Sequence, residues 1–329
     1  MFNFKSLVTS VICFLLALGR PLSASAETPS KRVFLTGKGI ATRLHEPVLR
    51  QVSDATSIFM TIPDDDYSGT NVNITKNDWV FLGTPVYKQF EHLAYLAKPC
   101  KNILCEKPVY LSLSEINQLK NLIADNHVLF RVNYALRFLP MIDEIKEFTR
   151  NNDVKSAKLV CNAGFNKNLP NKEWKRDVNL GGGILYSIFP HLVDLSIFLF
   201  GENDLENVSF ESSSKIPMDD IKMFSKTIGG IETTIDINLK ENFDEFKLEI
   251  ETVDEKVKTF DLINSSTNKI SATKYLNGSL SATSEISPWR ISFKYLLEKL
   301  FTAPSDVRFA RIEDAEVVHK VLRVILTNV

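Results

Sequence analysis

Between residues 31 and 122 the sequence repeats one unit, a short apolar run followed by a turn and then by apolar residues at helical spacing. Helical stripes follow the first run toward Val52, the third run over 90–97 and the fourth run over 116–122. Parallel strands need crossover connections, which are usually helices, so this alternation predicts a doubly wound parallel sheet. The predicted strands are 33–35, 58–62, 79–82 and 103–105.

The pattern changes after about Tyr134, where apolar residues alternate with polar ones over 235–239 and again over 246–250. Such alternation is typical of half-buried antiparallel strands. Helical patterns return at 288–301 and 312–326. At 329 residues the chain exceeds the ~250–300 residues at which one core stops growing. We therefore predict an α/β chain of two domains. A parallel-sheet domain would cover 31–134, and an α+β domain with a large open, mostly antiparallel sheet would cover 135–329.

Composition excludes several classes of protein. Apolar residues make up 44% and charged residues 24%, which is ordinary for a globular chain. The 39 Lys and Arg side chains balance 40 Asp and Glu, so there is no net positive charge to attract nucleic acid. The four cysteines form no C-x-x-C pair, and the histidines show no ligand spacing. Neither nucleic acid nor a metal is a predicted partner.

Residues 1–26 have the features of a secretory signal peptide. Lys5 precedes an apolar run over 7–18, and Ala24-Ser25-Ala26 supplies small residues for cleavage. The run is shorter than the ~20 residues that span a bilayer, so no stable membrane span is expected after cleavage. The sequence thus predicts an exported protein, periplasmic or secreted. The alternative is a cytoplasmic protein whose start is misassigned.

A glycine turn, Gly37-x-Gly39-x-x-Thr42, follows the first predicted strand directly. In a dinucleotide fingerprint the first glycine permits a tight turn, and the second lets the backbone approach a pyrophosphate at a helix N-terminus. Thr42 replaces the third glycine, and a simple strand-to-helix turn is the alternative interpretation. No acidic ribose ligand ends the second predicted strand, where Ile62-Pro63 stands, so the choice between NAD and NADP stays open.

Two further segments carry polar groups suited to chemistry. Glu106 and Lys107 follow the fourth predicted strand, at the edge where open α/β sheets bind ligands. After the glycine triplet 181–183, the spacing of Ser187, His191 and Asp194 predicts one polar line on a helix that is otherwise apolar. Pro190 is expected to kink this helix just before the histidine.

Taken together, these motifs resemble the glucose-fructose oxidoreductase/inositol dehydrogenase (Gfo/Idh/MocA) family. The resemblance implies a Rossmann domain, an α/β domain whose open sheet serves oligomerisation, and NAD(P)-dependent oxidation or reduction of a sugar, cyclitol or related carbonyl. The motifs are Gly37-Lys38-Gly39 with His45, Gly83-Thr84-Pro85, Cys105-Glu106-Lys107-Pro108, Tyr134 with Arg137-Phe138, Trp174-Lys175, Gly181-Gly182-Gly183, and His191 with Asp194.

The resemblance also assigns site residues by position. Lys107 and His191 would be catalytic. The cofactor would be bound by Gly37, Lys38, Gly39, Ile40, Thr84, Pro85, Glu106 and Lys107. The substrate, a small sugar-like molecule, would meet Tyr134, Arg137, Trp174, Lys175, Ser187 and His191.

The sequence departs from the family pattern at two places. Ser187 stands where the family usually has an aspartate, and the stretch between Asp64 and Trp79 is too short for the usual additional strand and helix, so the nucleotide domain is predicted to be reduced. The favoured prediction is an active NAD(P)-dependent oxidoreductase. The alternative is a degenerate exported member that serves as a ligand-binding or structural module. A homodimer or homotetramer is predicted, because the outer face of the open sheet is expected to be built partly from Ile, Val and Phe and to need cover.

Overall fold

The structure is a computed structural model of the 329-residue chain. The signal-peptide segment 1–26 and the predicted site residues Lys38, Trp174 and Lys175 lie outside the described residues, so those predictions stay predictions. The described residues are 32–37, 39–52, 60–62, 73–109, 112–162, 177–213, 220–238, 245–264 and 288–328.

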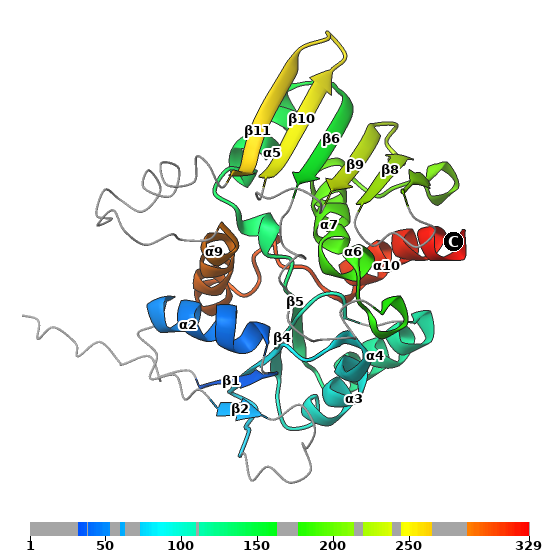
Figure 1. Cartoon of the computed structure of the whole chain (residues 1–329). Coiled ribbons are helices and arrows are strands. Elements are labelled where there is room, and N and C mark those ends of the chain that lie inside the picture. Colours follow the sequence, from blue (N-terminus) through cyan, green and yellow to red (C-terminus); the bar gives the residue numbers. More distant parts are fainter. Residues whose placement is uncertain are drawn as a thin grey trace, which may run out of the picture.

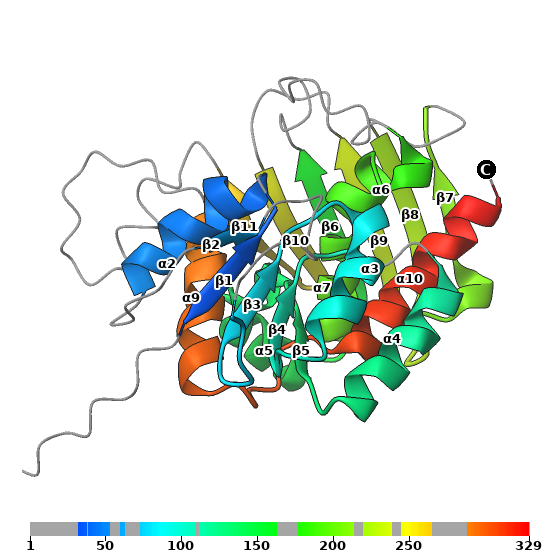
Figure 2. The same ribbon diagram turned by 90° about the horizontal axis from the view of Figure 1, so that it is seen from below.

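Five parallel strands form the first sheet, sheet A, in the order β2-β1-β3-β4-β5 (Figure 2). The order confirms the doubly wound parallel sheet, because the chain moves from β1 to one edge and then returns across β1 to build the other. Among the described residues no strand lies beyond β2 and no helix joins β2 to β3. The strands are β1 (Val33–Thr36), β2 (Met60–Ile62), β3 (Trp79–Leu82), β4 (Asn102–Cys105) and β5 (Leu129–Val132).

Helices α3 (Val86–Leu96) and α4 (Leu113–Asp125) cover one face of sheet A (Figure 2). Side chains on that face, such as Val80 and Ile103, belong to one buried cluster with Leu93 of α3 and Leu119 of α4. A capping box starts α4: Glu115 N donates to Ser112 Oγ at 3.2 Å, and Ser112 N donates to Glu115 Oε2 at 3.1 Å. These bonds satisfy backbone donors that have no partner within the helix, which is why α4 begins there.

The opposite face of sheet A is covered from both ends of the chain. A π-helical turn, η1 (Ala41–His45), continues into α2 (Glu46–Val52), and α9 (Pro288–Thr302) packs beside it (Figure 1). The predicted boundary at residue 134 therefore does not separate two structural layers, because α9 belongs to the core of sheet A. That core contains Val33, Leu35, Val48, Leu49, Trp79, Phe81, Leu104, Phe293, Leu296, Leu297 and Leu300.

The second sheet, sheet B, has six strands in the order β11-β10-β6-β9-β8-β7 (Figure 1). All neighbouring pairs are antiparallel except β6 with β9, which confirms a large, mostly antiparallel open sheet. The strands are β6 (Val154–Asn162), β7 (Ser209–Glu211), β8 (Asp220–Lys226), β9 (Glu232–Asn238), β10 (Glu245–Thr252) and β11 (Val257–Asn264).

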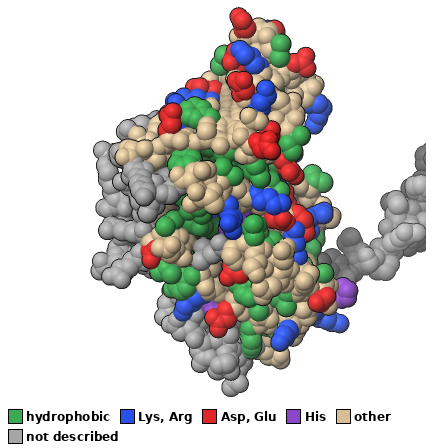
Figure 3. Space-filling view, turned by 90° about the vertical axis from the view of Figure 1, so that its right-hand side faces the viewer, with side chains coloured by type: hydrophobic (Ala, Val, Ile, Leu, Met, Phe, Trp, Pro, Cys, Tyr) green, Lys and Arg blue, Asp and Glu red, His purple; other side chains and the backbone are tan. Residues whose placement is uncertain are grey.

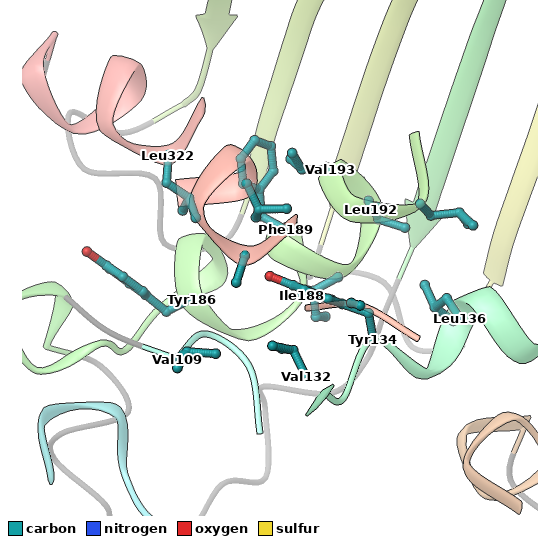
Figure 4. Packing of buried hydrophobic residues seen from close by; sticks show 14 of the residues in the cluster. Val109, Val132, Tyr134, Leu136, Tyr186, Ile188, Phe189, Leu192, Val193 and Leu322 are labelled. Carbon is teal, nitrogen blue, oxygen red and sulfur yellow. The ribbon is translucent and has the colours of Figure 1, made fainter. Parts of the chain in front are cut away.

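Helices α5 (Ile142–Asn151), α7 (Phe189–Phe200) and α10 (Ile312–Thr327) fill the space between the two sheets. One apolar cluster runs from sheet A through α7 and α10 to the inner face of sheet B, so the two halves share a continuous core. Figure 4 shows part of it: Val132 and Tyr134 from the end of β5 lie against Ile188 and Leu192, and Leu322 of α10 joins from the other side.

Among the described residues the outer face of sheet B is mostly polar, and the expected Ile, Val and Phe are reduced to Val160, Phe224 and Val257. Its side chains bond to one another: Lys247 pairs with Glu245 at 2.5 Å, and Ser156 Oγ donates to Glu251 Oε2 at 3.0 Å. Charged side chains of both signs also gather over the upper part of the molecule in Figure 3. Such a face needs no apolar cover. The predicted homo-oligomer stays a prediction and loses this support.

Within the described residues, no single helix is both long and apolar enough to cross a membrane. One pair of segments, Val178–Ser187 and Phe189–Phe200, passes that test only when its two parts are combined, and the two parts are bent by 53°. Most of α7 is buried in the core between the sheets.

Candidate active site

The carboxyl ends of four strands of sheet A meet at one edge, and the residues that follow them there are, except for Asn133, predicted site residues. Gly37 follows β1, Thr84 follows β3, Glu106 and Lys107 follow β4, and Asn133 follows β5. Ligands of open α/β sheets bind outside this edge. The fold therefore brings together residues that lie as far as 96 positions apart in the sequence.

The glycine turn adopts the backbone that a dinucleotide fingerprint requires. Gly37 has φ +86°, and a Cβ on it would lie 2.5 Å from the carbonyl oxygen of Gly83. Only glycine fits where these two turns touch. The next helix begins at Ile40, and no side chain caps its N-terminus, so backbone N–H groups remain there for an anion. The turn thus fits a pyrophosphate.

Buried side chains fix the turn after β3. The hydroxyl of Thr84 lies 3.1 Å from His92 Nδ1, and Pro85 stands at the N-cap position of α3. Gln89 Nε2 donates to the carbonyl oxygens of Thr84 and Glu106, at 3.2 Å each, which joins the turns after β3 and β4. These bonds hold the two turns together at the carboxyl edge of sheet A.

Glu106 lies in a buried polar cluster. His45 Nε2 and Asn133 Nδ2 each lie 2.6 Å from the same carboxylate oxygen, Oε1. Sequence reasoning did not assign a role to Asn133, because the strand before it was not predicted. The signal that would have found it is the short run Leu129–Val132, with Asn133 directly after it.

Lys107 reaches from the first half of the chain to the second. Its ammonium group is half-buried and donates to the carbonyl oxygens of Tyr186, at 3.3 Å, and Ser187. Those carbonyls are the last of α6 (Ile184–Ser187), where helical carbonyls lack partners within the helix. The lysine therefore holds the end of α6 against the carboxyl edge of sheet A.

The expected polar line of Ser187, His191 and Asp194 does not form on one helix. Helix α6 ends at Ser187, Ile188 separates it from α7, and the bend of 53° falls there. The bend confirms the kink predicted before His191, because Pro190 in the first turn of α7 has no N–H to continue the preceding helix. Ser187 Oγ is buried and accepts no hydrogen bond from the described residues.

His191 is buried, and its pKa lies well below the ordinary value because of burial and, after that, the positive charge of Lys107. The imidazole is therefore neutral at pH 7 and can accept a proton. The ring of Tyr134 contacts it edge-on, with 6.1 Å between the ring centres. Of the predicted substrate contacts in the described residues, Tyr134, Ser187 and His191 lie together near Lys107.

Arg137 lies apart from these groups, in the interior. Its guanidinium forms a bidentate pair with Asp194, Nε–Oδ2 2.8 Å and Nη2–Oδ1 2.6 Å, and Nη2 also lies 3.0 Å from Asp314 Oδ1. The arginine and Asp194 are 3% and 1% exposed. The structure thus gives Arg137 the role of joining α7 to α10, and its predicted contact with substrate stays a prediction.

The glycine triplet brings α6 close to the turn after β3. A Cβ on Gly181, whose φ is +79°, would lie 2.7 Å from Cβ of Val86 in α3. No cluster of three or more His, Cys, Asp and Glu side chains is arranged for a metal ion anywhere in the part of the chain that the structure describes.

Two family models match the chain. Residues 41–134 match one described as an oxidoreductase family with an NAD-binding Rossmann fold, and residues 153–221 match the C-terminal alpha/beta domain of the same family, GFO_IDH_MocA. The chain belongs to the Gfo/Idh/MocA oxidoreductase family. Membership confirms the resemblance drawn from the motifs, and sheet A is the NAD-binding Rossmann domain of the family.

Individual Gfo/Idh/MocA relatives are distant. Oxidoreductase P35 of Formosa agariphila is 31% identical over 136 residues, which cover 39% of this chain and 42% of that protein. Glucose-6-phosphate 3-dehydrogenase of Bacillus subtilis is 22% identical over 238 residues, which cover 64% of this chain and 67% of that protein. The matched part is thus less than half of the first relative's length.

Among solved structures, that of GenD2 from gentamicin A biosynthesis, in complex with NAD, has a TM-score of 0.70 at 18% identity. The match covers 91% of this chain and 94% of GenD2. At this identity the likeness establishes the fold, including both sheets.

Proposed function

We propose that the protein is an NAD(P)-dependent oxidoreductase that transfers hydride to or from a sugar, cyclitol or related carbonyl compound. The observation that carries the proposal is the meeting of Lys107 with a neutral His191 at the carboxyl edge of an NAD-binding sheet. A cation and a neutral imidazole side by side are what a reacting hydroxyl requires, one to hold its oxygen and one to take its proton.

The glycine turn and the uncapped start of η1 would bind the pyrophosphate, and Thr84, Pro85 and Glu106 would border the rest of the nucleotide. The bound nicotinamide would supply the hydride acceptor or donor.

In the oxidation direction, Lys107 would bind the substrate oxygen and favour its anionic form. The imidazole of His191, unprotonated at neutral pH, would accept the hydroxyl proton as the substrate oxygen binds to Lys107. In the reduction direction the same two groups would stabilise the carbonyl oxygen and return a proton to it. Tyr134, packed on His191, would keep the ring from turning away.

A sugar-like substrate is supported by the name of the Bacillus subtilis relative, a glucose-6-phosphate 3-dehydrogenase. The individual substrate is not part of the proposal, because specificity in this fold depends on loops around the site.

The decisive experiment is a fluorescence titration of the purified chain with NADH and NADPH, followed by an absorbance screen of sugars and cyclitols with the oxidised cofactors. We expect one cofactor to bind and at least one polyol to be oxidised. No binding of either cofactor at millimolar concentration would overturn the proposal. Binding without turnover on any compound would favour the alternative of a ligand-binding family member.

A further inference from the structure

The two carboxylate oxygens of Glu106 differ in their hydrogen bonds: Oε1 has two partners, and Oε2 has none among the described residues. His45 Nε2 and Asn133 Nδ2 both lie 2.6 Å from Oε1. No hydrogen bond from the described residues reaches Oε2. The backbone is fixed as well, because Glu106 N donates to the carbonyl oxygen of Leu82 at 2.8 Å. The carboxylate thus has one orientation, with one oxygen left over at the ligand-binding edge of sheet A.

The protonation of His45 follows from this partner. A carboxylate only accepts hydrogen bonds, so Nε2 of the histidine must carry a proton. Nδ1 is buried and has no hydrogen-bond partner among the described residues. A buried polar atom without a partner lowers stability, so an apolar side chain would serve better if the position only filled space. What the histidine supplies at this position, and an apolar side chain would not, is the bond to Glu106.

Aromatic side chains hold the ring of His45 in the plane that this bond requires. Phe293 of α9 stacks on it with 4.7 Å between ring centres and 24° between planes, and Phe81 of β3 meets it edge-on at 6.1 Å and 89°. His45 is 1% exposed, so it does not itself meet a ligand. Its influence on the site passes through Glu106.

We propose that His45 is a positioning residue of the cofactor site, which fixes Glu106 so that Oε2 accepts a hydrogen bond from an N–H or O–H group of the bound dinucleotide. The proposal rests on the proposed function, because it needs a nucleotide at this edge. It adds to the cofactor site a residue that does not itself contact the dinucleotide. Through the stacking on His45, it also connects the site to Phe293 of α9.

The test compares two substitutions of the full chain. His45→Phe keeps a ring against Phe293 but cannot donate to Glu106. His45→Gln places an amide N–H at the same number of bonds from Cα as Nε2. We expect the Kd for NADH, from fluorescence, to rise about tenfold in His45→Phe and to stay within about threefold of wild type in His45→Gln. Asn133→Ala removes the second donor and should raise Kd in the same direction.

The thermal midpoint is measured on every variant, and His127→Asn serves as a control, because His127 is exposed on a turn with φ +52°. A lower midpoint in His45→Phe with unchanged Kd would show a purely structural role and overturn the inference. If His45→Phe does not fold, equal Kd values for Asn133→Ala and wild type would overturn it. Failure of wild type to bind any dinucleotide would instead overturn the proposed function, and this inference with it.

Discussion

Lys107 and Ser187 are joined through the backbone, since the ammonium group of Lys107 donates a hydrogen bond to the carbonyl oxygen of Ser187. The resembled family usually has an aspartate at the position of Ser187. In this chain the partner of the lysine is therefore a pair of backbone dipoles at the end of α6 and not a carboxylate at that position. Lys107 is therefore held in position without an aspartate at residue 187.

Lys107→Ala should reduce turnover about 10²–10³-fold, because the group that would polarise the substrate oxygen is lost. The unfolding free energy should fall by only about 1 kcal/mol, since the lost bonds are those of a half-buried ammonium group to two backbone carbonyls. Steady-state kinetics and urea unfolding measure the two effects. Lys101→Ala is the matched control, because Lys101 Nζ also bonds helix-terminal carbonyls, those of Ala97 and Lys98. Equal turnover in both variants would assign Lys107 to scaffolding.

Ser187→Asp should increase turnover and move the acid limb of the pH–rate profile to higher pH. The new negative charge stands four residues before His191, across the bend at Ile188, and raises the pKa of the histidine from well below its ordinary value. The control Ser187→Asn introduces a side chain of the same size as aspartate but without its charge. It should change neither the turnover nor the pH–rate profile. A lower thermal midpoint with no gain in turnover would mean that the carboxylate finds no cation there, and it would count against the enzyme hypothesis.

Gly37→Ala should abolish dinucleotide binding. Its Cβ would lie 2.5 Å from the carbonyl oxygen of Gly83, and neither backbone segment can move without opening the turn. Gly201→Ala supplies the comparison, because Gly201 also has positive φ, +97°, but nothing lies within 4 Å of its Cβ. The unfolding free energy of Gly201→Ala should fall by only about 1–3 kcal/mol, the cost of strained backbone, and its affinity for NADH should not change. Comparable affinity in the two variants would contradict the assignment of Gly37 to the cofactor turn.

His319→Leu should make the protein less sensitive to acid. His319 is buried in α10, and burial, with the charge of Arg323, lowers its pKa to about 4. The unfolded chain binds a proton below its ordinary pKa of about 6.5 while the folded one does not, so stability falls as the pH drops from there toward 4. At pH 5 the loss is about 2 kcal/mol. Urea unfolding at pH 7 and pH 5 measures the loss of stability for each protein, and the loss should be larger in wild type than in the variant. An equal loss in both would refute the prediction.

Local patterns were sufficient to predict most of the fold. Apolar runs, the capping box at Ser112 and the alternation in β9 and β10 each depend on neighbouring residues, and each is present in the structure. Strand β5 was missed because Arg131 interrupts its apolar run, and its side chain is accommodated by the carbonyl oxygen of Pro304. Strand β6 was missed because its alternation is irregular in sequence: Lys155 and Ser156 are adjacent, and the apolar Val160 stands at an outward-facing position.

The site was only partly predictable for the same reason. Glu106, Lys107 and His191 stand in recognisable motifs, but the partners of Glu106 lie 61 residues before it and 27 after it. The spacing of Ser187, His191 and Asp194 suggested one helical face, and the break at Ile188 separated them. The apolar pattern of a helix such as α9 likewise does not indicate which sheet the helix covers.

The position of α9 determines when, during synthesis of the chain, sheet A can finish folding. A chain synthesised only as far as Asn264 already contains both stretches that match the family models, yet one face of sheet A is then covered by α2 without its neighbour. The nucleotide-binding half must wait for one of the last helices to emerge, and that non-local contact slows folding. A fragment ending at residue 134 would lack α9 in the cluster that contains Leu35, Phe81 and Leu104, so the two halves cannot be separated by a single cut.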